Sequence, residues 1–341
     1  AEVLKLERPG SGDDTRAWGP PYDARGRSTY FDAVNRNKRS LAIDLRSPEG
    51  LARAAALACE ADVLVENFRP GLLAGLGLGY GDLRPANPGL IYCSITGFGS
   101  SPEAAALPGY DLLVQALGGL MSVTGEPSGE PQKVGVALVD VLAGLFATVG
   151  ILAALNHRHA SGEGQLIEVD LLSSLLAALV NQASSYTVAG VVPGRMGTEH
   201  PSIAPYAVFE TKRGELVLAV GTDRQFQALA EVIARPALAH DSRFATNPDR
   251  VANRDALRHE LESLLAARPA EEWASLLTGA RVPAGVVNDI AAAFELAQTL
   301  GLDPLVALPD RGASSVRLPR NPIGLSATPP TYRTAPPDLS A

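Results

Sequence analysis

The first half of the chain alternates short apolar strands with helices, and this alternation limits the fold more than any other feature. Strand-like runs at 40–45, 62–67 and 90–95 are separated by helical segments, the clearest of which is 48–60. Short strands joined by helices of this length form parallel sheets with crossover helices. The sequence therefore predicts an α/β fold whose large domain spans residues 1–200.

The second half of the chain has a different texture, which indicates a smaller domain. Residues 188–205 are rich in Gly, Pro and polar side chains, as expected of a crossing between domains. Apolar runs at 206–209 and 215–220 bracket a tight turn and predict a hairpin. The elements expected after it are helices at 225–233, 254–267 and 269–278 and a strand at 284–287. We predict a small α+β domain over 201–303 and a C-terminal segment, 304–341, that returns to the large domain.

A long apolar segment at 136–155 raises the question of a membrane span, because its length matches the thickness of a bilayer. Asp140 lies inside it, and Gly144 and Gly150 weaken it as a membrane helix. A helix that is apolar on all sides is equally required at the centre of a large soluble fold. We therefore predict a buried helix here, followed by a strand at 165–170.

Asp140 is the unusual residue of the chain, because an acid in an apolar helix is unfavourable unless it is paired, hydrogen-bonded or used. In the first turn of the helix, the positive end of the dipole and free N–H groups would favour its ionised form. Apolar surroundings would remove water from it, and a desolvated carboxylate is a competent nucleophile toward an activated acyl carbon. An Asp140 that merely caps the helix explains the pattern equally well.

Two other places carry polar side chains suited to a ligand site. Asn67 and Arg69 directly follow a predicted strand, and parallel sheets bind ligands at the carboxyl ends of their strands. Tyr110 and Asp111 follow a Pro-Gly turn, which is expected to place them at the edge of a pocket. Simple turn chemistry is the alternative for this second pair.

Composition narrows the classes of partner. The net charge of −8 argues against nucleic acid, while a local basic site for one small polyanion stays possible. The sequence contains no Walker loop and no Ser-centred nucleophile elbow. Its two cysteines exclude a disulfide framework and fit a reducing cytosol, and its five scattered histidines indicate no metal site. We expect a cytoplasmic protein without a metal.

Several short blocks, taken in order, resemble the family III CoA-transferases, which are also named for carnitine and bile-acid CoA transfer. The resemblance covers nearly the whole chain and rests on the order and spacing of the blocks. The blocks are ERPG at 7–10, GDDTR at 12–16, NRNKRS at 35–40, VENFRPG at 65–71, GYD at 109–111, the Asp140 helix with GILAAL at 150–155, and GEGQ at 162–165.

The resemblance implies an enzyme that moves CoA between carboxylic acids through a covalent aspartyl intermediate. It implies Asp140 as the nucleophile, with Tyr110 and Asp111 beside the reacting thioester. The residues that it implies around the CoA nucleotide are Arg8, Leu45, Arg46, Asn67, Phe68 and Arg69. CoA is then a substrate, and no cofactor is bound permanently. The resemblance also implies a Rossmann-like sheet and a homodimer of two interlocked chains.

The chain departs from the family pattern in ways that keep alternatives open. Gly75 stands where many relatives carry Lys or Arg for a CoA phosphate, and the family's first strand would precede Ala1; both features suit a non-catalytic CoA-binding subunit. A 2-methylacyl-CoA racemase of the same fold is another alternative, although racemases carry His in place of Tyr110. Arg195 and His200, in a segment similar to the dicarboxylate branch, are candidates for pairing with a distal carboxylate.

Overall fold

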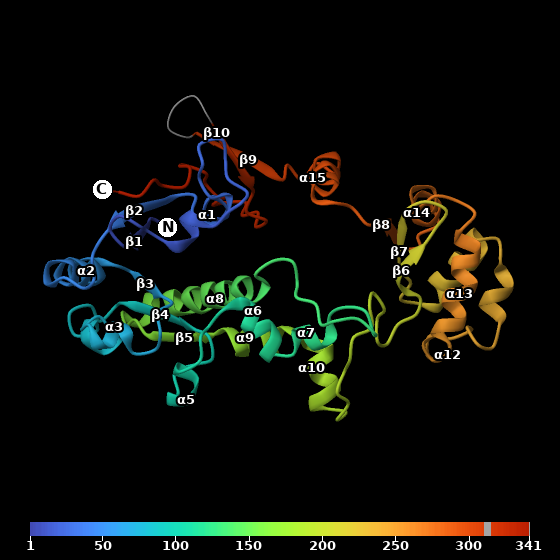
Figure 1. The fold of residues 1–341 in the computed structure, drawn as a ribbon, viewed down its shortest axis with the longest axis horizontal. Helices are drawn as coiled ribbons and strands as arrows, with labels where there is room; N and C mark the ends of the chain where they lie inside the picture. Colours follow the sequence, from blue (N-terminus) through green and yellow to red (C-terminus); the bar gives the residue numbers. More distant parts are fainter. Residues whose placement is uncertain (310–314, 341) are drawn as a thin grey trace. The chain divides into compact units, whose positions relative to one another are not determined.

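The structure, a computed structural model, describes residues 1–309 and 315–340 (Figure 1). Contacts within the chain divide it into two compact units. Unit 1 comprises Ala1–Ser94, Thr148–Glu168 and Ile290–Ala341, and unit 2 comprises Ile95–Ala147 and Val169–Asp289. The predicted domains stay a prediction, and the part of the predicted C-terminal segment at 310–314 lies outside the described residues.

The parallel strands lie mostly in unit 1 and form two separate sheets, not one. β1 (Val3–Glu7) pairs in parallel with β2 (Lys38–Ala42), and β3 (Val63–Glu66) pairs in parallel with β4 (Ile91–Thr96). β5 (Leu166–Asp170) lies on the other side of β4. These strands, with helices between them, confirm the predicted α/β class.

β2 begins and ends earlier than the predicted strand at 40–45. The chain leaves the strand because it turns between Asp44 and Ser47, where the Ser47 N–H donates to the Asp44 carbonyl at 3.0 Å. Ser47 then caps α2 (Pro48–Glu60) by accepting a hydrogen bond from the Gly50 N–H at 3.0 Å. Pro at the first helical position also favours this start, and the range of α2 is the predicted one.

The remaining elements of unit 1 are short helices and one antiparallel pair of strands. They are the 3₁₀ helix η1 (Asp14–Ala17), α1 (Thr29–Val34), α3 (Leu72–Gly75), α4 (Tyr80–Leu83), α15 (Ile290–Thr299) and the antiparallel pair β9 (Leu305–Pro309) and β10 (Ser315–Pro319). A core of small and aliphatic side chains joins α2, α3, α4 and β4. Its buried members are Ala54, Ala58, Leu73, Leu78, Leu83, Leu90 and Tyr92.

Asn37, just before β2, holds a part of the C-terminal segment. It has a left-handed backbone (φ 62°), which Asn tolerates better than most residues. Its side-chain amide donates to the Thr331 carbonyl at 2.7 Å, and its Oδ1 accepts from the Arg333 N–H at 2.8 Å. Its own N–H donates to the Thr334 carbonyl at 3.0 Å. Residues at opposite ends of the sequence therefore lie together in unit 1.

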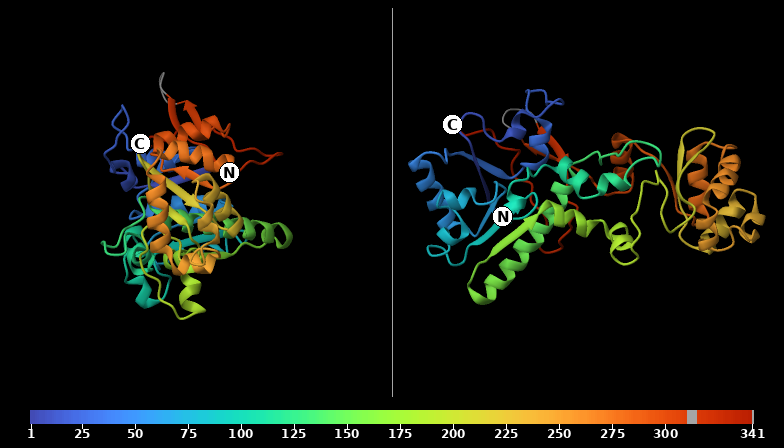
Figure 2. Two further views of the ribbon diagram at one scale, coloured as in Figure 1. Left: turned by 90° about the vertical axis from the view of Figure 1, so that its right-hand side faces the viewer. Right: turned by 60° about the horizontal axis from the view of Figure 1, so that its bottom comes forward.

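The hairpin predicted in the second half is present in unit 2. β6 (Tyr206–Glu210) and β7 (Glu215–Ala219) are antiparallel, and β8 (Ala284–Val286) pairs with β7 (Figure 2). The helices that follow are α11 (Asp223–Val232), the 3₁₀ helix η2 (Pro236–His240), α12 (Asn247–Ala252), α13 (Arg254–Leu265) and α14 (Ala270–Gly279). Strands and helices share one apolar core, which includes Phe209, Leu218, Phe226, Leu261 and Trp273.

A second core of unit 2 joins α6 (Asp111–Leu117), α9 (Leu171–Ala178) and the start of α8 (Leu138–Ser161). Its buried members are Val114, Val139, Ala143, Leu171 and Leu175. The other helices of this part are α5 (Pro102–Ala105), α7 (Leu120–Val123) and α10 (Val180–Thr187). The first turn of α8 is thus anchored in a packed core.

α8 is buried on one side only, so the prediction of a buried helix is wrong for the single chain. Three of its alanines, Ala143, Ala147 and Ala154, are buried. Larger apolar side chains on another side are 55–64% exposed. We name these the exposed stripe: Val141, Leu145, Val149 and Leu152. The sequence could not show this difference, because both sides of the helix are apolar.

α8 is also long and apolar enough to cross a membrane, with a mean hydropathy of 2.3 in its most apolar part. This test considers length and composition alone, and the core helix of a soluble protein passes it equally. An acid in the first turn, Asp140, is unfavourable in a bilayer.

Candidate active site

Asp140 lies in the first turn of α8, the position that the sequence analysis considered as a condition. Val139 before it is fully buried in the core that α8 shares with α6 and α9, whereas Asp140 is exposed. Neighbouring helical residues point in directions about 100° apart, so a buried Val139 turns Asp140 away from that core. The helix therefore presents this carboxylate from a rigid base.

Asp111, the first residue of α6, caps α8. Its Oδ1 accepts hydrogen bonds from the N–H groups of Val139 at 2.8 Å and Asp140 at 3.3 Å. N–H groups in the first turn of a helix have no partner within the helix, so this carboxylate supplies one. The capping role that the sequence left open for Asp140 therefore belongs to Asp111.

Gln115 completes this arrangement from one turn further along α6. It is fully buried, and its Nε2 donates to Asp111 Oδ2 at 2.6 Å. Its Oε1 accepts from the Val134 N–H at 2.9 Å, in the segment that leads into α8. Both carboxylate oxygens of Asp111 are thus engaged.

Gln115 is not among the site residues expected from the sequence. Its signal is the spacing, because Asp111 and Gln115 are four residues apart in a helix whose other side chains are apolar. Polar residues at that spacing lie on one helix face and pair there. A buried polar pair of this kind marks a functional or structural network.

The pKa of the Asp140 carboxyl is raised above its ordinary value, so the prediction that the helix end favours its ionised form is wrong. Burial is the larger cause, since protein atoms surround the carboxyl even though part of the residue faces solvent. The negative charge of Asp111 is the second cause. The helix end does not offset them, because Asp111 already accepts the hydrogen bonds of the first turn. The ionised carboxylate is less stable here than in water, and a neutral acyl derivative would relieve that destabilisation.

Two glycines fix the backbone beside Tyr110. A Cβ on Gly109 would lie 2.7 Å from the Gly97 Cα, and a Cβ on Gly97 would lie 2.5 Å from the Gly109 Cα. Neither distance is possible for a real side chain, so both positions need glycine. Tyr110 follows this contact, immediately precedes α6 and is 70% exposed. The contact sets the direction from which Tyr110 and Asp111 project.

The residues expected around the CoA nucleotide all lie in unit 1, after strand ends. They follow β1 (Arg8), β2 (Leu45 and Arg46) and β3 (Asn67, Phe68 and Arg69). The carboxyl ends of parallel strands are the usual ligand edge of such sheets. Asp140, Tyr110 and Asp111 belong to unit 2, where Asp111 contacts the first turn of α8.

The cations among the expected CoA residues are accessible. Arg8 pairs with Asp14 and also donates to the Gly12 carbonyl at 3.3 Å. Arg46 pairs with Asp44 at 3.1 Å, and its side chain is 91% exposed. Exposed ion pairs contribute little to stability, so either guanidinium is free to exchange its carboxylate for a phosphate.

Gly75 and Phe68 also bear on CoA binding. Gly75 ends α3, and a Cβ built there meets no atom within 4 Å. A long side chain would therefore fit at Gly75, although this chain has none. Phe68 is partly exposed, as a surface for stacking a base requires.

The two candidates for recognising a distal carboxylate already have protein partners. Arg195 donates through Nε to the Glu126 carbonyl at 3.1 Å and through a terminal nitrogen to the Gly129 carbonyl at 2.8 Å. His200 accepts from the Ser202 N–H through Nδ1 at 3.1 Å. Arg195 thus braces a loop, and the pairing of either residue with a substrate stays a prediction.

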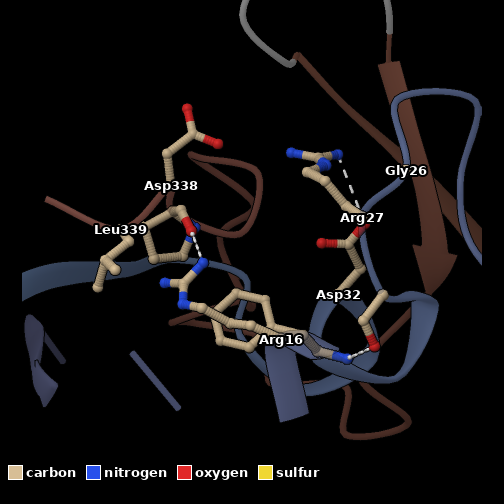
Figure 3. A pocket seen from close by; sticks show the side chains of 9 residues that line it. Arg16, Gly26, Arg27, Asp32, Asp338 and Leu339 are labelled. Carbon is tan, nitrogen blue, oxygen red and sulfur yellow. Dashed lines mark hydrogen bonds and ion pairs between the residues drawn. The ribbon is translucent and has the colours of Figure 1, made fainter. Parts of the chain in front are cut away.

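A pocket of about 190 Å³ lies in unit 1, and none of the expected CoA residues lines it (Figure 3). Arg16, Arg27 and Asp32 line it, together with the C-terminal residues 337–339. Arg16 is committed to the Glu7 carboxylate at 2.8 Å, and Arg27 donates to Asp32 at 3.4 Å. Because its cations serve the protein's own carboxylates, we do not assign the pocket to the candidate active site. Among residues 1–309 and 315–340, no cluster of His, Cys, Asp and Glu could hold a metal ion.

Comparisons with known proteins agree on one family. The family model described as CoA-transferase family III matches residues 1–341. A succinate–glutarate CoA-transferase of Agrobacterium fabrum is 42% identical, with 99% of this chain and 86% of that protein covered. An acetyl-CoA:oxalate CoA-transferase of Acetobacter aceti is 40% identical, with 96% and 82% covered.

A solved structure supports the same assignment. The crystal structure of a CaiB/BaiF family protein from Brucella suis matches with a TM-score of 0.86 and 41% identity. The match covers 99% of this chain and 89% of that one. Because a family model, curated relatives and a solved fold all extend over nearly the whole sequence, the chain belongs to the CoA-transferase family III.

Proposed function

We propose that this CoA-transferase moves CoA from an acyl-CoA to a dicarboxylic acid, with Asp140 as the residue that becomes acylated. The observation that carries the proposal is the exposed Asp140 in the first turn of α8, beside an Asp111 that occupies the N–H groups of that turn. The acceptor class is supported by relatives named for succinate, glutarate and oxalate, all of which are dicarboxylates.

The proposed reaction divides into balanced exchanges. The Asp140 carboxylate attacks the thioester carbonyl, the CoA thiolate leaves, and a mixed anhydride forms. The thiolate then attacks the Asp140 carbonyl, which releases the first acid and leaves an aspartyl-CoA thioester. The acceptor carboxylate attacks this thioester and expels the thiolate, which finally attacks the acceptor carbonyl and restores Asp140. Covalent catalysis of this kind replaces one difficult exchange by several easier ones.

CoA acts here as a substrate, and the proposal needs no permanently bound cofactor. Arg8, Arg46 and Arg69 are proposed to contact its phosphates, because guanidinium groups offer paired donors to phosphate oxygens. Phe68 and Leu45 are proposed to cover the adenine. Their positions after three strand ends of unit 1 support this assignment.

The active enzyme is proposed to be a cytoplasmic homodimer whose chains interlock, with a Rossmann-like arrangement of the parallel strands in each large domain. The exposed stripe of α8 supports the dimer, because a large apolar surface on a water-soluble protein indicates a binding partner. A second copy of the chain is the proposed occupant.

Trapping tests the role of Asp140. The enzyme is incubated with succinyl-CoA and hydroxylamine, and its peptides are then analysed by mass spectrometry. We expect a hydroxamate at Asp140 in the wild type and none in Asp140→Asn, which should also lose at least about a thousandfold in kcat. Turnover in the wild type without modification of Asp140 would rule the mechanism out.

The racemase alternative is tested by a chiral 2-methylacyl-CoA without any acceptor acid. A racemase needs a base at the α-carbon, and the resemblance implies a His for that role at the position where this chain has Tyr110. We expect no epimerisation. Epimerisation without an acceptor would favour the racemase.

A further inference from the structure

Gln115 is the most deeply buried polar side chain near Asp140, and its hydrogen bonds converge on the segment that carries Asp140. Its Nε2 donates to Asp111 Oδ2 at 2.6 Å and lies 3.5 Å from the Val136 carbonyl oxygen. Its Oε1 accepts from the Val134 N–H at 2.9 Å. The amide is thus fully used, and each partner belongs either to the cap of α8 or to the chain just before it.

The two side chains together hold a short stretch of backbone at several points. Gln115 holds it at Val134 and Val136, and Asp111 holds it at Val139 and Asp140. We call Gln115 and Asp111 with these hydrogen bonds the clamp. Its base is rigid, because Val114 beside Gln115 is fully buried in the core with α9. At the end of this stretch, Val139 is also fully buried in the core that α8 shares with α6 and α9.

We infer that Gln115 is a positioning residue for the proposed nucleophile: it orients Asp111 and fixes residues 134–139, and thereby places the Asp140 carboxylate. This inference rests on the proposed function of Asp140. Gln115 itself is buried and does not touch substrate. Its effect is expected on the chemical step, because small displacements of a reacting group reduce the rate strongly.

The first test replaces Gln115 by Met, which has a similar length and cannot donate or accept these hydrogen bonds. We expect Gln115→Met to lower kcat by about ten- to a hundredfold, with KM for succinyl-CoA changed by less than about threefold. The rate of hydroxylamine capture at Asp140 should fall by the same factor as kcat. A variant that only destabilised the fold would also lower the apparent kcat with KM unchanged, so kcat and the capture rate are expressed per folded enzyme, with the folded fraction measured by circular dichroism.

Gln182 offers the matched control. It lies on α10, and its Oε1 is buried without a hydrogen-bond partner. Gln182→Met makes the same chemical change where no such network is lost, so kcat and capture at Asp140 should stay within about twofold of the wild type. Equal losses in Gln182→Met and Gln115→Met would overturn the inference.

A second variant keeps the test decisive if Gln115→Met fails to fold. Gln115→Glu retains the acceptor for Val134 but sets a second carboxyl against Asp111, and such pairs share one proton. The titratable groups on the segments around residue 115 are Asp111, Asp140 and the exposed Lys133. The helices α7 and α9 pack on α6 and contain no titratable side chain. The shared proton restores the missing hydrogen bond at low pH.

The activity of Gln115→Glu relative to the wild type should therefore rise at least about fivefold as pH falls from about 9 to about 6. A flat ratio would contradict the inference. Capture at Asp140 distinguishes a failure of the proposed function from a failure of this inference. If Asp140 is not modified in the wild type, the proposed function is wrong, and this inference is wrong with it. Normal modification with unchanged rates in both Gln115 variants removes the inference alone.

Discussion

The negative charge of Asp111 has two opposite consequences at the start of α8. It stabilises the helix, because a carboxylate accepts hydrogen bonds well at a helix N-terminus. It also disfavours a second negative charge nearby, and so adds to the burial that raises the pKa of Asp140. One residue therefore both places the proposed nucleophile and makes its ionised form less stable.

Asp111→Asn separates these consequences. Asp140 must be ionised to attack, so the rate falls as pH drops through its pKa. Removing the neighbouring charge lowers the pKa of Asp140, and the acid limb of kcat/KM should move to lower pH. The plateau should fall by about tenfold or more, because an Asn cannot accept hydrogen bonds from both the helix and Gln115. The pH dependence of kcat/KM measures both effects.

The control for this change is Asp255→Asn. Asp255 is exposed in the first turn of α13, so the substitution removes the same charge from the first turn of another helix. Its pH profile should match that of the wild type. An acid limb in Asp111→Asn that stays in place or moves to higher pH would contradict the charge argument.

Gly75 offers a gain of function at a single position. Nothing lies within 4 Å of a Cβ built there, so Gly75→Arg should be tolerated and should restore the cation that many relatives carry for a CoA phosphate. We expect KM for succinyl-CoA to fall by about three- to tenfold with kcat unchanged. Gly279→Arg, at the equally open end of α14, is the matched control. If KM for succinyl-CoA were the same in both variants, the CoA phosphate would not bind near residue 75.

Secondary structure was predictable where local rules decide it. Pro48 and the Ser47 cap define the start of α2, and the turn between β6 and β7 defines the hairpin; both were predicted. The position of Asp140 in a first helical turn was considered only as a condition. Local patterns could not reveal the capping of α8 by Asp111, because Asp111 and Val139, whose N–H donates to it, are 28 positions apart in the sequence. Burial is the larger cause of the raised pKa of Asp140 and the charge of Asp111 is the smaller one, and both depend on tertiary packing that the local sequence does not show.

The contact between Gly97 and Gly109 is a second long-range feature, and it supports α6. Either glycine changed to Ala would force a Cβ to within 3 Å of backbone atoms, which cannot move as a flexible side chain can. We expect Gly109→Ala to reduce the free energy of unfolding by about 1–3 kcal/mol and to lower kcat. Urea denaturation followed by circular dichroism measures the first effect.

Gly81→Ala in α4 is the control for the glycine contact. No atom lies within 4 Å of its added Cβ, and Ala is the better helix former, so stability should be unchanged or increase by about 0.5–1 kcal/mol. If Gly109→Ala were as stable as Gly81→Ala, the close approach beside Tyr110 would not exist in solution.

The exposed stripe bears on the assembly of the whole molecule. Each chain carries a net charge of −8, so two copies repel one another at long range. Association therefore requires a short-range apolar surface, and the four aliphatic side chains of the stripe recur every three or four residues along one side of α8. The sequence could not distinguish this side from the buried one, and the resemblance alone implied a dimer.

Leu145→Glu tests whether a second copy covers the stripe. In a symmetric dimer the substitution introduces two buried charges, which is strongly unfavourable, so the variant should sediment as a monomer at concentrations where the wild type is a dimer. Leu276→Glu, on the exposed side of α14, makes the same change outside the stripe and should leave the dimer intact. Analytical ultracentrifugation without detergent measures both. A monomeric wild type that retains full activity would exclude the dimer, and a wild type that needs detergent would favour a membrane as the partner of α8.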